Sequence, residues 1–75
     1  MKLAIDLQDH EGISHDKIVW TLDDKATVDQ LMDKIESVFK IDKDRQRLFF
    51  KGSQLLFGTL QKAGIENEDT VVLVT

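Results

Sequence analysis

Two histidines and three carboxylates near the amino terminus are the residues whose types could support chemistry. His10 and His15 lie among Asp9, Glu11 and Asp16, and imidazole and carboxylate groups bind zinc and transfer protons. A zinc site needs three or four ligands in a fixed geometry, which a polar loop between two strands does not supply. We therefore expect solvated histidines here, with a pH-sensitive contact near about pH 6.5 as the alternative.

No other pattern in the chain is typical of an enzyme. The chain has no cysteine, which excludes a thiolate nucleophile, a disulfide framework and a zinc–thiolate site. Ser14, Ser37 and Ser53 lack the partner spacing of an activated nucleophile. The four glycines are isolated and form no phosphate-binding loop. The sequence therefore predicts no catalytic residue, no cofactor and no metal.

Binding chemistry is better supported, by a ten-residue segment that begins at Gln46. It reads as a short strand, a tight turn and a second strand that ends at Leu55. Because side chains alternate along a strand, one face carries Arg47, Phe49 and Lys51 and the other carries Leu48 and Phe50. The apolar pair can enter a core. Phe49 is then expected to point away from the core, between two cations.

The last segment, Asp69–Thr75, predicts a strand with apolar residues on both faces. The chain contains one substantial helix, which can cover only one face of a sheet. If Val71 and Leu73 point inward, Val72 and Val74 emerge on the opposite face, and they lie beside Phe49 if the two strands are neighbours. These three side chains would form a patch on the order of 300 Å², a size at which surface patches are often functional. Strand propensity alone is the alternative explanation.

The amino-terminal part predicts two strands and a helix that must position this patch. Lys2–Leu7 and Ile18–Leu22 alternate as strands, and their expected buried residues are Leu3, Ile5 and Leu7, and Ile18, Trp20 and Leu22. The polar residues 8–17 predict a hairpin with a long connection.

The helix has a clear start signal, because Thr27 with Gln30 forms a capping-box pattern. Its expected apolar stripe consists of Val28, Leu31, Ile35 and Val38, flanked by Met32 and Phe39. Lys40 follows the expected helix, and a left-handed closing residue at that position would favour glycine.

The segment Gln46–Leu55 resembles the ubiquitin family's Gln-Arg-Leu-Ile-Phe-x-Gly-x-Gln-Leu motif. Thr59-Leu60 and Asp69–Val74 are also similar to that family, and the resemblance extends from Leu3 to Val74. It implies an α+β fold of the β-grasp type, with a mixed sheet of four to five strands packed on one helix at about residues 27–39. Residues 1–75 are then a single ubiquitin-like domain. Leu60 and Ile65 are expected to anchor a short helical turn.

The resemblance also implies a set of protein-binding residues. Phe49 stands where ubiquitin has the isoleucine at the centre of its recognition patch, Val72 replaces the patch histidine, and Val74 matches the patch valine. Ile13 is the only plausible substitute for a leucine that the first loop contributes in ubiquitin. The expected rim consists of Arg47, Lys51, Gly52 and Gln54. Ser53 and Asp6 fall where ubiquitin has lysines, so partner choice should differ.

From this resemblance we expect a protein-interaction module. Its expected partners are a proteasome subunit, an unfoldase, a deubiquitinase, a conjugating enzyme or ligase, or a chaperone component. The sequence ends at Thr75 without Gly-Gly, so we expect a non-conjugated domain, the amino-terminal module of a longer protein. Two alternatives stay open: a modifier whose Gly-Gly tail is absent from this sequence, and a structural β-grasp domain that packs within its parent chain.

Composition bounds these expectations. The 75 residues make one small domain, and ten basic against fourteen acidic residues give a net charge of −4, which argues against nucleic-acid binding. The chain has no apolar run of about 20 residues and no signal peptide. We expect no membrane partner, a monomer, and a location in the cytoplasm or nucleus.

Overall fold

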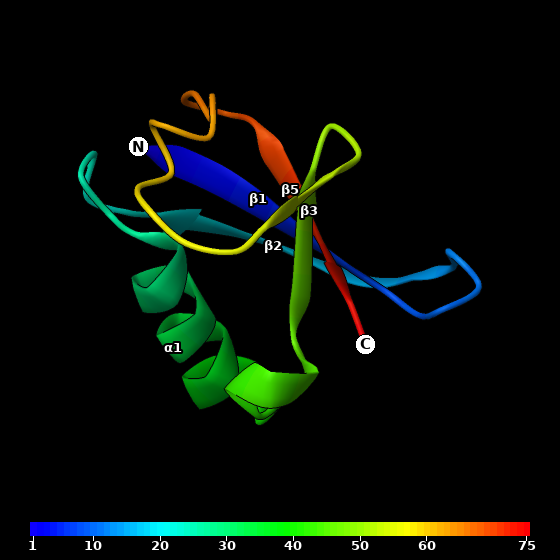
Figure 1. The fold of residues 1–75 in the computed structure, drawn as a ribbon. Helices are drawn as coiled ribbons and strands as arrows, with labels where there is room; N and C mark the ends of the chain where they lie inside the picture. Colours follow the sequence, from blue (N-terminus) through cyan, green and yellow to red (C-terminus); the bar gives the residue numbers. More distant parts are fainter.

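Five strands and one α-helix make up the fold in the computed structural model, which describes all of residues 1–75 (Figure 1). The strands are β1 (Lys2–Gln8), β2 (Ser14–Thr21), β3 (Arg47–Phe50), β4 (Ser53–Leu55) and β5 (Thr70–Val74). They form one sheet in the order β2-β1-β5-β3-β4, in which β1 and β5 are parallel and the other pairs are antiparallel. The helix α1 (Val28–Phe39) lies against one face, and a short 3-10 helix, η1 (Lys43–Arg45), follows it. The expected α+β β-grasp fold is confirmed.

The core lies between α1 and the inward face of the sheet. Leu3 and Ile5 on β1, Leu48 and Phe50 on β3, and Val71 and Leu73 on β5 are buried, as their alternation predicted. They pack with Val28, Leu31 and Ile35 of α1. Leu60 and Ile65, the expected anchors of the segment after β4, are buried as well, although this segment forms successive turns rather than a helix. No helix in the structure is both long and apolar enough to cross a membrane.

The helix begins and ends as the sequence predicts. The Gln30 amide donates to the Thr27 hydroxyl (3.1 Å), and the Thr27 amide donates to the Gln30 side-chain oxygen (3.0 Å), which completes the capping box. At the other end Lys40 adopts φ 61°, in the left-handed region. Val38 was predicted in the buried stripe, and this prediction was wrong: its side chain is 48% exposed. Phe39 instead faces β2, where its ring lies 6.2 Å from that of Trp20.

The hairpin between β1 and β2 is tighter than the sequence predicted. Both strands extend into the polar segment, so the connection covers only residues 9–13 instead of 8–17. The Asp9 carboxylate accepts hydrogen bonds from the amides of Glu11 (2.8 Å) and Ile13 (3.1 Å), and Gly12 supplies a positive φ of 83°. Polar side chains thus close the turn, which a reading based on hydrophobic alternation does not detect.

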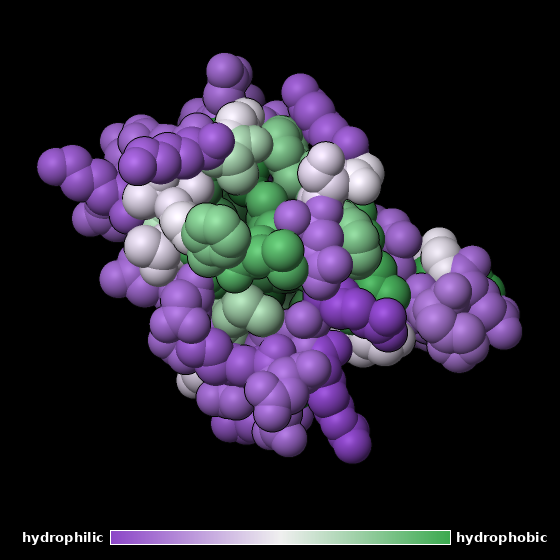
Figure 2. Space-filling view, viewed as in Figure 1, coloured by the Kyte–Doolittle hydropathy of each residue, from purple (hydrophilic) through white to green (hydrophobic).

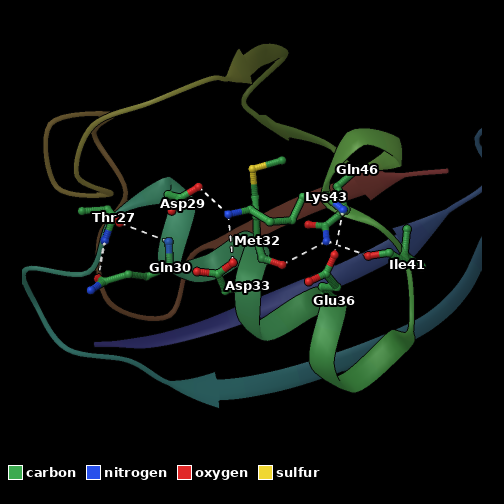
Figure 3. A network of polar contacts seen from close by, with 9 residues as sticks. All are labelled: Thr27, Asp29, Gln30, Met32, Asp33, Glu36, Ile41, Lys43 and Gln46. Carbon is green, nitrogen blue, oxygen red and sulfur yellow. Dashed lines mark hydrogen bonds and ion pairs between the residues drawn. The ribbon is translucent and has the colours of Figure 1, made fainter.

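A network of polar contacts ties the segment after α1 to the helix (Figure 3). Gln46 is only 4% exposed, and its amide nitrogen donates to the carbonyls of Met32 (2.9 Å) and Ile41 (3.0 Å). The Lys43 ammonium bridges the carboxylates of Asp29 (2.6 Å) and Asp33 (2.8 Å). The hydrogen bond to Asp29, and then that to Asp33, raise the pKa of Lys43 above its ordinary value. This network positions the start of β3, which carries the candidate site.

Candidate functional site

The face of the sheet opposite α1 carries the residues that the sequence predicted as a binding patch. Phe49 on β3 pairs directly with Val72 on β5 and, on its other side, with Gln54 on β4. Arg47 pairs with Val74 in the same register. Strands β3, β4 and β5 thus place Phe49, Val72, Val74, Arg47 and Gln54 on one surface, which we call the outer face.

The apolar centre of the outer face exposes only part of its side chains. Phe49, Val72 and Val74 are each half-buried, whereas Arg47 and Gln54 are exposed. Neighbouring side chains on adjacent strands stand about 5 Å apart and cover part of one another, so these three offer less free surface than isolated exposed residues would. They still lie on the face that the helix leaves uncovered.

Lys51 lies elsewhere than the alternation predicted. Strand β3 ends at Phe50, and Lys51 and Gly52 adopt positive φ values of 50° and 82° as a two-residue turn. The Lys51 ammonium then lies 5.3 Å from the centroid of the ring of Phe50, a residue whose side chain faces inward. The turn therefore directs this cation away from Phe49. No atom approaches within 4 Å of a Cβ added to Gly52, so the backbone conformation, not space, favours glycine there.

Ile13 lies at the same end of the sheet as Val74, but Gln8 stands between them. Gln8 pairs with Val74 on one side and with Ser14, the neighbour of Ile13, on the other. Ile13 itself is 55% exposed in the β1–β2 turn. It therefore extends the apolar surface only at its margin.

An acidic residue borders the outer face beside Val72. Asp6 on β1 pairs with Val72 in the parallel ladder. Hydrogen bonds from the Ser14 hydroxyl and the Gln8 side-chain amide, with a smaller contribution from the charge of Lys17, lower the pKa of Asp6. The outer face is thus bounded by a cation, Arg47, at one side and by a fixed anion at the other.

The histidines lie in and beside the β1–β2 turn, away from Phe49. His15 is within 2.8 Å of the Asp9 carboxylate, and this contact, followed by the hydrogen bond from the Ile13 amide, lowers the pKa of Asp9. His10 lies 3.9 Å from Glu11, and both residues are exposed. No group of three His, Cys, Asp or Glu side chains is arranged to hold a metal ion.

Two features escaped the sequence analysis. Gln46 was noticed only as part of a motif, and its buried hydrogen bonds depend on the three-dimensional positions of Met32 and Ile41. Leu56 and Phe57, which follow β4, are the most exposed large apolar residues of the chain. The signal for them was available: two consecutive large apolar residues between a predicted strand and Gly58.

A β-grasp sheet with one helix on its inner face and an apolar centre on its outer face defines a ubiquitin-like domain. The model of the Ubiquitin family matches residues 5–75, which is nearly the whole chain, and the protein therefore belongs to the ubiquitin family. No curated protein matches the chain.

Proposed function

We propose that this protein is an interaction module that docks other proteins on its outer face. The observation that carries the proposal is the direct pairing of Phe49 with Val72 on the sheet face that α1 leaves uncovered. Apolar side chains on such a face lower the free energy when a partner buries them. Family membership supports a binding role without naming the partner.

The charges around the apolar centre define what kind of surface fits. Arg47 favours a carboxylate on the partner, whereas Asp6, beside Val72, favours a cation or a hydrogen-bond donor. A partner helix or loop with an apolar stripe and one charge of each sign meets both requirements. The patch is small, so we expect affinities in the micromolar class, about 8 kcal/mol of binding free energy.

The proposed partners are components of the ubiquitin, proteasome or chaperone machinery, namely a proteasome subunit, an unfoldase, a deubiquitinase, a conjugating enzyme or ligase, or a chaperone component. The domain would act there as a monomer in the cytoplasm or nucleus, by binding and not by catalysis. It would be one module of a longer chain. A conjugated modifier is the alternative, and reading the natural transcript beyond Thr75 separates the two: a Gly-Gly end supports the modifier, and a further domain supports the module.

The proposal is tested by affinity capture from cell extract with three forms of the domain side by side. These are the wild type, Phe49→Ala on the outer face, and Val38→Ala on the exposed side of α1 as the matched control. Circular dichroism checks that all three are folded. We expect a set of proteins that is bound by the wild type and by Val38→Ala and lost with Phe49→Ala. An identical set with all three forms would contradict docking on the outer face.

A further inference from the structure

The strand register fixes the positions of two opposite charges relative to the apolar centre of the outer face. Asp6, Val72 and Phe49 pair in one row across β1, β5 and β3. Arg47 pairs with Val74 in the next row, two residues before Phe49 along β3. Arg47 and Asp6 therefore stand at diagonally opposite corners of the apolar centre, with β5 between them.

The distance between these two charges indicates the shape of a partner. Arg47 and Asp6 are two strands apart across the sheet and two residues apart along the strands. With about 4.8 Å between strands and about 3.3 Å per residue, their Cα atoms lie about 12 Å apart. Two turns of an α-helix rise about 10.5–12 Å, whereas one turn rises only about 5.4 Å. An extended segment on the same face would leave its backbone groups unpaired, so a helix laid along this diagonal is favoured.

Both charges are available to a partner. The guanidinium of Arg47 is exposed and forms no ion pair within the protein, so its N–H groups can hold a carboxylate in a bidentate pair. The Asp6 carboxylate accepts the Ser14 hydroxyl on one oxygen and the Gln8 side-chain amide (2.9 Å) on the other. These bonds fix the carboxylate and leave each oxygen a lone pair for a second donor. Lys17 pairs with Asp6 from β2, outside the diagonal, and forms no ion pair with it.

The surroundings of Arg47 favour an anion at that corner. A hollow where β3 begins and β5 ends is lined by Arg47 with two further basic residues, Lys40 and Arg45, and with two acidic residues, Asp42 and Asp44. None of these five side chains forms an ion pair, and together they leave one net positive charge. A carboxylate of the partner is thus the charge that fits this corner.

The direction of the helix follows from its own stability. An acidic residue near the amino end and a basic residue near the carboxyl end stabilise a short free helix, which lowers the entropy cost of binding. Residues three and four positions after the acidic one lie on the same side of the helix and would meet the apolar centre. We propose, on the basis of the proposed docking function, that the outer face selects an amphipathic helix. Its acidic residue binds Arg47, a basic residue two turns later binds Asp6, and apolar residues lie between them.

The test is a selection on the wild-type domain from a phage-displayed library of short helices with one randomised face. Selected helices are synthesised and titrated against the wild type, Phe49→Ala, Arg47→Glu, Asp6→Lys and the double variant Arg47→Glu/Asp6→Lys. Lys62→Glu and Glu66→Lys, at exposed positions in the segment between β4 and β5, are the charge-matched controls. Amide NMR spectra confirm that each variant is folded, and Asp6→Asn replaces Asp6→Lys if that variant is unfolded.

A second apolar area requires its own control. Figure 2 shows apolar side chains gathered in the middle of the view, over the segment that follows β4 and beside the start of α1. Leu56 and Phe57, directly after β4, are 68% and 86% exposed, and burying them under an apolar helix also lowers the free energy. Phe57→Ser identifies helices bound there, so only helices that depend on Phe49 are scored.

We expect the Phe49-dependent helices to carry Asp or Glu at one position and Lys or Arg seven or eight positions later. They should lose about tenfold or more in affinity with Arg47→Glu or Asp6→Lys, because each variant opposes like charges, and bind both controls normally. A synthetic copy with its two charges exchanged should prefer the double variant. Phe49-dependent helices without this spacing, or with the basic residue first, would overturn the proposal and leave the docking function standing. If no selected helix depends on Phe49, docking of helices on the outer face is contradicted as well.

Discussion

Single side chains in this protein act mainly by satisfying backbone groups that would otherwise be unpaired. Gln46 is the clearest case, because its side-chain amide nitrogen donates to the Ile41 carbonyl in the segment before η1, and it adds a second hydrogen bond to the Met32 carbonyl within α1. A buried carbonyl without a partner carries a desolvation penalty. The motif that placed Gln46 at the start of β3 thus reflects the architecture and not the binding chemistry.

Replacing Gln46 with leucine should therefore destabilise the protein by about 1–3 kcal/mol, since it removes both hydrogen bonds and leaves the Ile41 carbonyl without a partner. Gln54→Leu is the matched control, because Gln54 is exposed on the outer face, and it should change stability by less than about 0.5 kcal/mol. Urea unfolding of both variants measures the difference. Equal effects would show that the buried hydrogen bonds of Gln46 contribute no stability.

The single side chain of Asp9 should also make the stability of the fold depend on pH. Its hydrogen bonds with His15 and the Ile13 amide lower its pKa in the folded protein below the ordinary value of 3.8. A carboxyl whose pKa is lower in the folded than in the unfolded protein stabilises the fold at any pH above its unfolded-state pKa. This stabilisation is lost as the pH falls through the folded-state pKa. Wild type should thus melt at a higher temperature than Asp9→Asn at pH 7, and the gap should narrow below about pH 4.

His15→Ala provides the control for this pH effect. It removes the main cause of the lowered pKa of Asp9 while the two backbone amides stay, so it should reproduce part of the effect of Asp9→Asn. Thermal melts from pH 2.5 to pH 7 monitored by circular dichroism measure both variants. A gap between wild type and Asp9→Asn that does not change with pH would contradict the role given to the carboxylate.

At the scale of elements, the sequence predicts most of this fold because local signals and tertiary packing agree. The strand alternation and the capping box of Thr27 and Gln30 specify β1, β3, β5 and the start of α1. The predictions are wrong where polar side chains, the ends of elements or tight turns determine the local structure. Asp9 shortens the first turn, α1 leaves Val38 exposed near its end, and the turn at Lys51 breaks the alternation.

The end of α1 offers a prediction at this scale. Lys40 holds φ 61°, a conformation that glycine adopts without steric cost. Lys40→Gly should raise stability by up to about 1 kcal/mol. Ser37→Gly, in the exposed interior of α1, is the matched control and should lower stability by about 0.5–1 kcal/mol. Chemical denaturation compares the two, and a loss of stability with Lys40→Gly would contradict the assigned strain.

At the scale of the whole molecule, topology creates the candidate site. Parallel pairing of β1 with β5 and antiparallel pairing of β5 with β3 bring Asp6, Val72 and Phe49 into one row. Periodicity predicted which side chains leave the core, but the adjacency of β3 and β5 came from the family resemblance. The Leu56–Phe57 pair and the direction of Lys51 depend on loop conformations, which alternation does not specify.

The central claim is that partners bind the outer face. The most direct measurement is an amide NMR titration of the labelled domain with a protein that the wild type captures and Phe49→Ala does not. We predict that the largest shifts fall on β3 and β5, around Phe49, Val72 and Val74, and that the exposed residues of α1 shift little. Shifts centred on α1, with β3 and β5 unchanged, would contradict the claim.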